Sequence, residues 1–211
     1  MVVAAHPDDE VLGMGGTIKK LSLGKNKLQL CVISEGASAQ YKDRKMIEVR
    51  KEACIKSGKL LGISNFEFFD FPDMRLDSVP HLEINKKLET VIKKYEPEVV
   101  YTTPYNDLNQ DHQRVFDSTL VATRPQVSNV KSVLSYEIPG PVKTPFQPTV
   151  FEDITKEISY KIRALQVYKS EIKKFPHPRS VEAIESLAMY RGTQVGLHKA
   201  ESFQLIRSIL K

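Results

Sequence analysis

Three side chains from two parts of the chain form a pattern typical of a metal site. His6 and Asp9 flank a turn that Pro7 stiffens, so an imidazole and a carboxylate can converge on one point. His112 follows a different predicted strand and can supply the third ligand. Catalytic zinc sites typically take three nitrogen or oxygen ligands and leave one position for water. The three residues therefore predict an open zinc site, although another divalent metal would also suit these ligands.

Acidic neighbours would give such a site hydrolytic chemistry. Asp8 would remain free beside the metal as the general base for the bound water, and Asp111 would hold an imidazole in the metal-binding tautomer. An open site of this kind hydrolyses an amide, an ester or a phosphate ester. A simpler explanation stays open, because Asp8 and Asp9 before a helix would also cap it and favour its dipole. His6 would then be an ordinary loop histidine.

The elements that must position these residues follow from the alternation of short apolar runs and helical patterns. The predicted strands cover residues 1–5, 28–34, 65–71, 98–103 and 132–138, and helices are predicted over 11–23, 43–61, from Leu82 to Ile92, over 155–172 and from Ser180 through Tyr190. This order predicts an α/β fold with a Rossmann-like, mostly parallel sheet and helices on both faces. Residues 1–211 form a single predicted domain, with a less regular C-terminal third from about residue 125, and residues 200–209 form a short final element of unassigned type.

The polar residues then gather at one edge of the predicted sheet. In open parallel sheets, ligands bind beyond the carboxyl ends of the strands. Acidic or histidine-bearing loops follow four of the predicted strands, beginning at His6, Ser34, Pro72 and Tyr105. This clustering of carboxylates is informative in a basic protein, which has a formal net charge of +5.

Composition excludes several other classes of protein. Two cysteines are too few for a disulfide scaffold or a cysteine-built zinc finger. Apolar residues make up 41% of the chain, too many for disorder, and no apolar run is long enough for a membrane span. Lysines alternate with glutamates, so no nucleic-acid partner is predicted. No signal peptide opens the chain, and we expect a cytoplasmic protein.

The glycines near the first predicted helix do not form a dinucleotide-binding motif. The segment Gly13-Met14-Gly15-Gly16 would need a further glycine at Ile18, and it lies inside the helix rather than in the preceding turn. We expect these small residues to let the helix approach the sheet closely.

The motifs resemble those of the PIG-L/LmbE-type zinc-dependent N-acetylglucosamine deacetylases. The opening VVAAHPDDE, from Val2 to Glu10, matches the family signature almost residue for residue, and Asn109-Gln110-Asp111-His112 matches its second motif. Shorter matches include Ser34-Glu35-Gly36, the helix segment around Arg50, Phe71-Pro72-Asp73 and Ala200-Glu201-Ser202-Phe203. The resemblance covers nearly the whole chain, and its first motif is the most specific.

The resemblance implies roles for individual residues. It implies zinc on His6, Asp9 and His112, with Asp8 as general base. Arg50 and Asp73 match positions that hold sugar hydroxyls or a neighbouring phosphate, and we assign Asn106 and Asp107, in the loop before the second motif, to substrate binding as well. The implied reaction is hydrolysis of the N-acetyl amide of a 2-acetamido sugar or its conjugate. Such families often assemble, so a homo-oligomer is also allowed.

One departure from the family pattern affects the expected chemistry. Asn109 stands where many members have a histidine that is thought to act as general acid or oxyanion partner. Asparagine donates no proton at neutral pH, although its amide can hydrogen-bond an oxyanion. We therefore expect Asp8 to return its proton to the leaving amine, with Asn109 and Asp111 also counted as catalytic residues. Two alternatives are hydrolysis of another acyl amide and a catalytically impaired sugar- or nucleotide-binding module.

Overall fold

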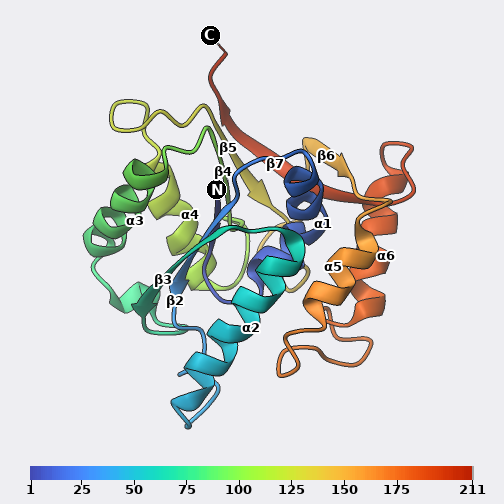
Figure 1. The fold of residues 1–211 in the computed structure, drawn as a ribbon, viewed down its shortest axis with the longest axis horizontal. Helices are drawn as coiled ribbons and strands as arrows, with labels where there is room; N and C mark the ends of the chain where they lie inside the picture. The colour runs from blue at the N-terminus through green and yellow to red at the C-terminus, as the bar shows by residue number, and fades with distance from the viewer. Residues whose placement is uncertain (211) are drawn as a thin grey trace.

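A seven-stranded sheet forms the centre of the molecule (Figure 1). The computed structural model describes residues 1–210, and the strands lie in the order β3-β2-β1-β4-β5-β7-β6. They are β1 (Val2–Ala4), β2 (Gln29–Ser34), β3 (Asn65–Phe71), β4 (Val99–Thr102), β5 (Ser132–Tyr136), β6 (Val150–Asp153) and β7 (Ala200–Ser208). The strands β1 to β5 pair in parallel, whereas β7 is antiparallel to both β5 and β6. The predicted α/β class with a mostly parallel sheet is confirmed.

Helices cover both faces of the sheet, as expected. One face carries α1 (Asp9–Leu23), α2 (Lys45–Leu61), α5 (Ile158–Leu165) and α6 (Val181–Thr193), and the other carries α3 (His81–Tyr95) and α4 (Gln110–Ala122) (Figure 1). Successive side chains of a strand point to opposite faces. Val2 and Ala4 accordingly join the core under α1, while Val3 and Ala5 join the core under α3 and α4. No helix within residues 1–210 has the length and hydropathy to cross a membrane.

The strand order creates a crevice between β1 and β4. These strands are neighbours in the sheet, but the helices that follow them, α1 and α4, lie on opposite faces. Beyond the carboxyl ends of two such strands the connections diverge, and this is where open α/β sheets bind their ligands. The first turn of α1 and the first turn of α4 therefore face the same space.

Helix α1 packs closely on the sheet at Gly13, which has no side chain, whereas Gly15 and Gly16 lie against Lys161 and Ile154. A Cβ on Gly13 would lie 2.3 Å from a ring carbon of Tyr136 on β5, so the predicted close approach is confirmed. The helix is kinked at Met14, whose φ is −146°. Its second half starts afresh there, and the Glu201 carboxylate of β7 accepts the N–H of Gly16 at 2.9 Å. Glu201 thus acts as a cap contributed from the opposite end of the chain.

The C-terminal third differs from the prediction in two places. Residues 155–172 were expected to form one helix, but α5 ends at Leu165 and the chain then turns. The turns direct Tyr168 and Glu171 inward, where both side chains are buried. Burial of these two polar side chains against the rest of the fold overrides the helical periodicity of the segment. The strand β6 was not expected, because four residues in a proline-rich region give little periodic signal.

Candidate metal centre and active site

His6, Asp9 and His112 meet in the crevice between β1 and β4. His6 follows β1, Asp9 opens α1, and His112 lies in the first turn of α4. One Asp9 oxygen, Oδ2, lies 3.4 Å from His6 Nδ1, and the other, Oδ1, lies 3.4 Å from His112 Nε2. The potential ligand atoms all fall within 4.8 Å of one another, and all three side chains are buried. The spacing suits three ligands of one cation.

The Asp9 carboxylate tests whether a cation fits this site. Its Oδ2 atom accepts the backbone N–H groups of Ala5 at 3.1 Å and His6 at 2.8 Å. Its Oδ1 atom is buried and has no hydrogen-bond partner. A buried carboxylate oxygen that accepts no hydrogen bond is costly, and a metal ion would satisfy it. The donor set of two imidazoles and one carboxylate matches the ligands of catalytic zinc sites, so the residues present fit zinc.

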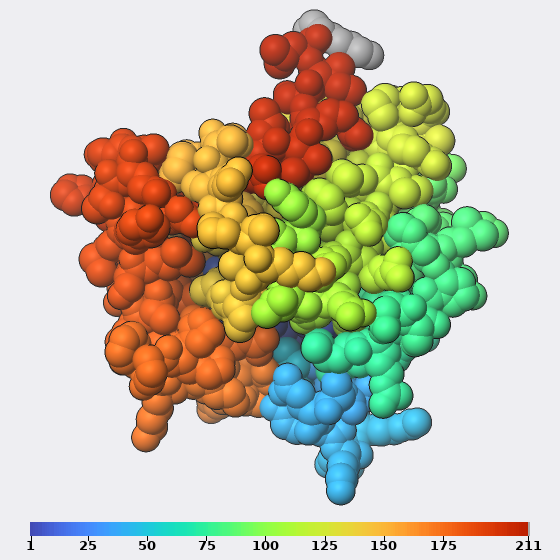
Figure 2. Space-filling view, turned by 180° about the vertical axis from the view of Figure 1, so that it is seen from behind, coloured from blue at the N-terminus to red at the C-terminus, as the bar shows by residue number. Residues whose placement is uncertain are grey.

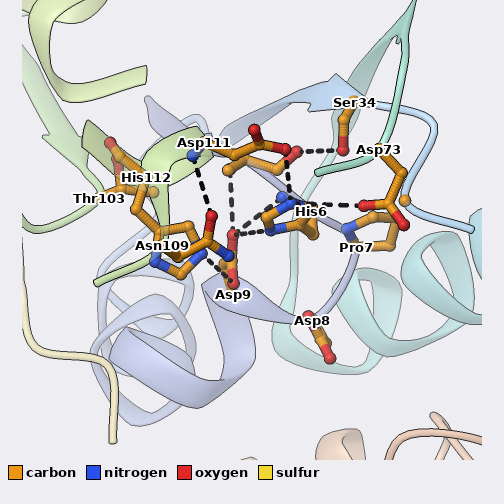
Figure 3. Close-up of polar contacts among 12 residues, drawn as sticks. His6, Pro7, Asp8, Asp9, Ser34, Asp73, Thr103, Asn109, Asp111 and His112 are labelled. Atoms are coloured by element: carbon orange, nitrogen blue, oxygen red, sulfur yellow. Dashed lines mark hydrogen bonds and ion pairs between the residues drawn. The ribbon is translucent and has the colours of Figure 1, made fainter. Parts of the chain in front are cut away.

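Two further aspartates orient the imidazoles, and Figure 3 shows one of them, Asp111, beside His6. Asp107 Oδ2 lies 2.7 Å from Nδ1 of His112, which leaves the Nε2 atom to face Asp9. Asp111 Oδ2 lies 3.1 Å from Nε2 of His6, which leaves Nδ1 to face Asp9. Asp111 is itself fixed, because it accepts the Met74 N–H at 2.8 Å. Hydrogen bonds of this kind fix the tautomer of a metal-binding histidine.

The charges of the site favour a cation. Burial lowers the pKa of His6, but hydrogen bonds to Asp111 and Asp9 outweigh it and raise that pKa to about 10. Burial likewise opposes ionisation of His112, and the charge of Asp9 together with the bond to Asp107 raises its pKa to about 9. Burial raises the pKa of Asp9, yet the neighbouring imidazoles bring it well below its ordinary value. Positive charge is therefore strongly stabilised here, and a divalent ion would replace two protons.

Asp8 is held apart from these three side chains. Figure 3 shows its carboxylate separated from them, and no hydrogen bond or ion pair joins it to His6, Asp9 or His112. It instead lies 3.5 Å from Arg50 Nη2 and 3.2 Å from Arg179 Nη1. Burial raises the pKa of Asp8, and both arginines oppose that effect. No hydrogen bond links its side chain to the α1 backbone, so it is not acting as a helix cap.

The backbone at Asp8 is strained. Its φ is 121°, a region that residues with a Cβ rarely adopt. The conformation is held at both ends, because the Asp8 N–H donates to Glu10 Oε2 at 3.1 Å and the Asp8 carbonyl accepts the N–H groups of Val11 and Leu12. Glu10 is in turn hydrogen-bonded by the Tyr168 hydroxyl. Strain of this kind persists only where the surroundings enforce it.

The residues expected to bind substrate occupy different places. Arg50 is buried and donates to the carbonyls of Pro7 and Gly36, so its guanidinium braces the loops after β1 and β2. Asp73 follows β3, and its Oδ1 atom lies 3.5 Å from His6 Nε2. Asn106 donates to the Thr144 carbonyl at 2.7 Å and ties down the loop after β5.

Asn109 caps helix α4. Its side-chain oxygen accepts the N–H of Asp111 at 2.9 Å, and its amide nitrogen lies 3.4 Å from the Met74 sulfur. Both ends of the side chain are therefore engaged in local contacts. The cap explains why this asparagine fits the start of the helix, whatever further part it takes in chemistry.

The site opens to the surface. Figure 2 shows a hollow in which dark-blue atoms from the start of the chain lie beneath the surrounding segments. The light-blue segment after β2, the green segment after β3 and the yellow-green and gold segments after β4 and β5 border it. The loops at the carboxyl ends of the parallel strands thus form the rim, in agreement with the expected location of the site.

Comparison with known proteins identifies the family. Residues 1–123 match the family described as PIG-L, GlcNAc-PI de-N-acetylase. The chain belongs to this family. It is 31% identical over 179 residues to YaiS of Escherichia coli (strain K12), described as an uncharacterized deacetylase, covering 81% of this chain and 90% of YaiS. This PIG-L-family protein is therefore an amidohydrolase of the deacetylase type.

Solved structures share its fold. The N,N'-diacetylchitobiose deacetylase from Pyrococcus horikoshii, complexed with its inhibitor MPG, has a TM-score of 0.81 at 23% identity, covering 98% of this chain and 82% of that chain. The 4-carboxy-2-hydroxymuconate hydratase GalB from Pseudomonas putida KT2440 has a TM-score of 0.82 at 23% identity, covering 100% of this chain and 96% of GalB. At this identity the likeness concerns the fold alone, and function must be argued from the site.

Two residues near the site escaped the sequence reasoning. Glu171 and Arg179 approach Asp8 and Arg50 from the segment between α5 and α6. This segment lies outside the matched residues 1–123. Neither residue belongs to a recognisable motif, and only the abrupt end of the helical pattern at residues 175–178 marked the segment as a turn.

Proposed function

We propose that this protein removes the N-acetyl group from an N-acetylglucosamine-type sugar or its conjugate, with zinc held by His6, Asp9 and His112. The observation that carries the proposal is the buried Oδ1 atom of Asp9, which accepts no hydrogen bond, beside two imidazoles that aspartates orient. Membership of a deacetylase family supports the reaction type. Zinc, when bound, supplies a Lewis acid and makes water a nucleophile at neutral pH.

The protein's own residues supply the proton transfers. Asp8 takes a proton from the attacking water as the new carbon–oxygen bond forms, and it returns a proton to the nitrogen as the carbon–nitrogen bond breaks. The products are acetate and a free amine. Burial raises the pKa of Asp8, which suits a carboxylate that must both accept and donate a proton. We assign both transfers to Asp8 because Asn109 cannot act as an acid, although the family pattern usually has a histidine at this position.

The remaining polar residues orient the reacting groups. Asp107 and Asp111 keep the imidazoles in the metal-binding tautomer. Asp73 and Asn106 are the remaining candidates for contact with sugar hydroxyls. The Oδ2 atom of Asp73 has only one hydrogen bond, a 3.3 Å contact from the Ala39 N–H, and the buried Oδ1 atom of Asn106 has none. Arg50 serves the substrate indirectly, through the two loops that it braces.

Release of amine and acetate tests the proposed function. The zinc-loaded protein is incubated with a panel of N-acetylated sugars, sugar nucleotides and glycosides, and both products are quantified. We expect equimolar products from at least one substrate, loss of turnover with zinc retained in Asp8→Asn, and unchanged turnover in the exposed control Asp117→Asn. Full zinc occupancy without amine release from any compound would instead favour a sugar-binding module. Turnover persisting in Asp8→Asn would contradict the role of Asp8.

A further inference from the structure

The proposed general base is one of four charged side chains that form a closed ring. Asp8 lies near Arg50 and Arg179, and Glu171 lies near the same two arginines. The Glu171 carboxylate is 2.9 Å from Arg179 Nη1 and 3.7 Å from Arg50 Nε. The side chains of Asp8, Arg50 and Glu171 are 1%, 3% and 2% exposed, and that of Arg179 is 30% exposed. Two carboxylates and two guanidinium groups balance their charges at the edge of the site.

Asp8 depends on this ring for its position. Neither of its carboxylate oxygens has a hydrogen-bond partner, although both are buried. A buried carboxylate without hydrogen bonds is held in place mainly by neighbouring charges. Arg50 contributes less to this than its proximity indicates, because its Nη groups already donate to Pro7 and Gly36 and Nη2 comes no nearer to Asp8 than 3.5 Å. Arg179 is closer, at 3.2 Å.

Arg179 is itself anchored on both sides. Glu171 Oε2 accepts from its Nη1 atom at 2.9 Å, and Glu171 Oε1 accepts from the Tyr41 hydroxyl at 3.1 Å. The next residue, Ser180, caps α6 by accepting the Ala183 N–H at 3.1 Å. A side chain fixed in this way can hold a partner carboxylate in one orientation, since a planar guanidinium loses little freedom on pairing.

We propose that Arg179 is a positioning residue that sets the orientation of the Asp8 carboxylate, so that residues 171–180 complete the active site from outside the matched family region. The inference rests on the proposed function, in which Asp8 transfers the protons. Arg179 touches neither the metal ligands nor the reacting atoms and acts through Asp8. The N-terminal motif and the C-terminal third are therefore coupled in catalysis.

Kinetics of Arg179 variants test this role. A misplaced catalytic group costs roughly a hundredfold in rate, so Arg179→Ala should lower kcat by about that factor, with KM within about twofold and zinc content unchanged. The kcat of Arg179→Lys, which keeps the charge without the planar guanidinium group, should lie between those of the wild type and Arg179→Ala. Guanidinium ion added to Arg179→Ala should restore part of kcat, which a merely structural role would not produce. Arg163→Ala, an exposed arginine on α5, is the matched control and should behave as the wild type.

A structure of Arg179→Ala separates this inference from the proposed function. We expect the Asp8 carboxylate to rotate or lose its defined orientation while His6, Asp9 and His112 stay in place. An unchanged Asp8 orientation would overturn the inference even if the wild type showed no turnover. Wild-type turnover with unchanged kcat in Arg179→Ala would also overturn it while leaving deacetylation intact. Loss of turnover in Asp8→Asn together with guanidinium rescue of Arg179→Ala would support both the proposed function and the positioning role of Arg179.

Discussion

Replacing Asp107 by asparagine should weaken zinc binding although the residue is not one of the proposed ligands. In the wild type, Asp107 Oδ2 pairs with His112 Nδ1 at 2.7 Å and Oδ1 accepts the Asn109 N–H at 2.8 Å. An asparagine would keep its oxygen on the Asn109 N–H and turn its amide NH₂ toward His112. Nδ1 would then have to accept a hydrogen bond, and the proton would move to Nε2, the atom that must face the metal.

The expected size follows from what such orienting partners contribute elsewhere. Loss of a hydrogen-bonded partner of a metal-binding histidine typically weakens metal affinity about 10- to 100-fold. This factor corresponds to about 1.4–2.7 kcal/mol, because each tenfold change in affinity is about 1.4 kcal/mol.

A competition titration against a chromogenic zinc chelator at constant pH measures this effect. Asp117→Asn, an exposed change on α4, the helix that carries His112, is the control and should bind zinc as the wild type does. Asp107→Ala removes both hydrogen bonds and guards against a flipped asparagine. If both Asp107 variants bound zinc as tightly as the wild type, the assignment of Nε2 of His112 as a ligand atom would be wrong.

Three further changes test other parts of the account. Gly36→Ala should lower the unfolding free energy by at least about 1 kcal/mol and weaken zinc binding, because φ is +68° and the new Cβ would lie 2.3 Å from Pro7 Cδ. Denaturant unfolding measures the loss of stability and a zinc titration measures the loss of affinity. No change in either would show that the loops after β1 and β2 are not in contact. Asn109→Ala should destabilise the protein by about 1 kcal/mol through loss of the α4 cap, and urea unfolding measures this change. A simultaneous loss of all turnover would show that Asn109 has a chemical role as well. Burial raises the pKa of Glu171, but the charge of Arg50, the hydrogen bond from Ser170 and the charge of Arg179 together depress it below its ordinary value. The stability that the ionised form contributes is therefore present above about pH 4.5 and lost as pH falls through the lower folded value. The stability difference between wild type and Glu171→Gln should shrink on acidification below that pH, and a difference independent of pH would refute this stabilisation of the carboxylate.

The parallel part of the fold was accessible from the sequence because its signals are local. Each of β1 to β5 is a short run rich in apolar residues, and the helices after β1 to β3 show a repeating apolar face. The helix after β4, α4, was not predicted, although it carries His112. The general rule that ligands bind beyond strand ends then brought His6 and His112 to one edge before any contact was known. The sheet order explains why they meet there, since β1 and β4 are neighbours.

Other features depend on contacts that sequence spacing does not encode. Both Asp107 and Asp111 flank His112, yet only Asp107 pairs with it, while Asp111 pairs with His6. The choice is made by the direction in which the start of α4 faces β1. The antiparallel strand β7 and the turn that ends α5 likewise depend on long-range packing, since Glu171 contacts Tyr41 and Arg50 from far along the chain. Their local patterns therefore gave no indication of their neighbours.

Anomalous X-ray diffraction at the zinc edge, from crystals of the zinc-loaded protein, tests the central claim most directly. We expect one strong peak bonded to His6 Nδ1, Asp9 Oδ1 and His112 Nε2, at about 2.0–2.2 Å from each. A peak at another group of side chains, or no peak at these three despite full zinc occupancy in solution, would contradict the claim.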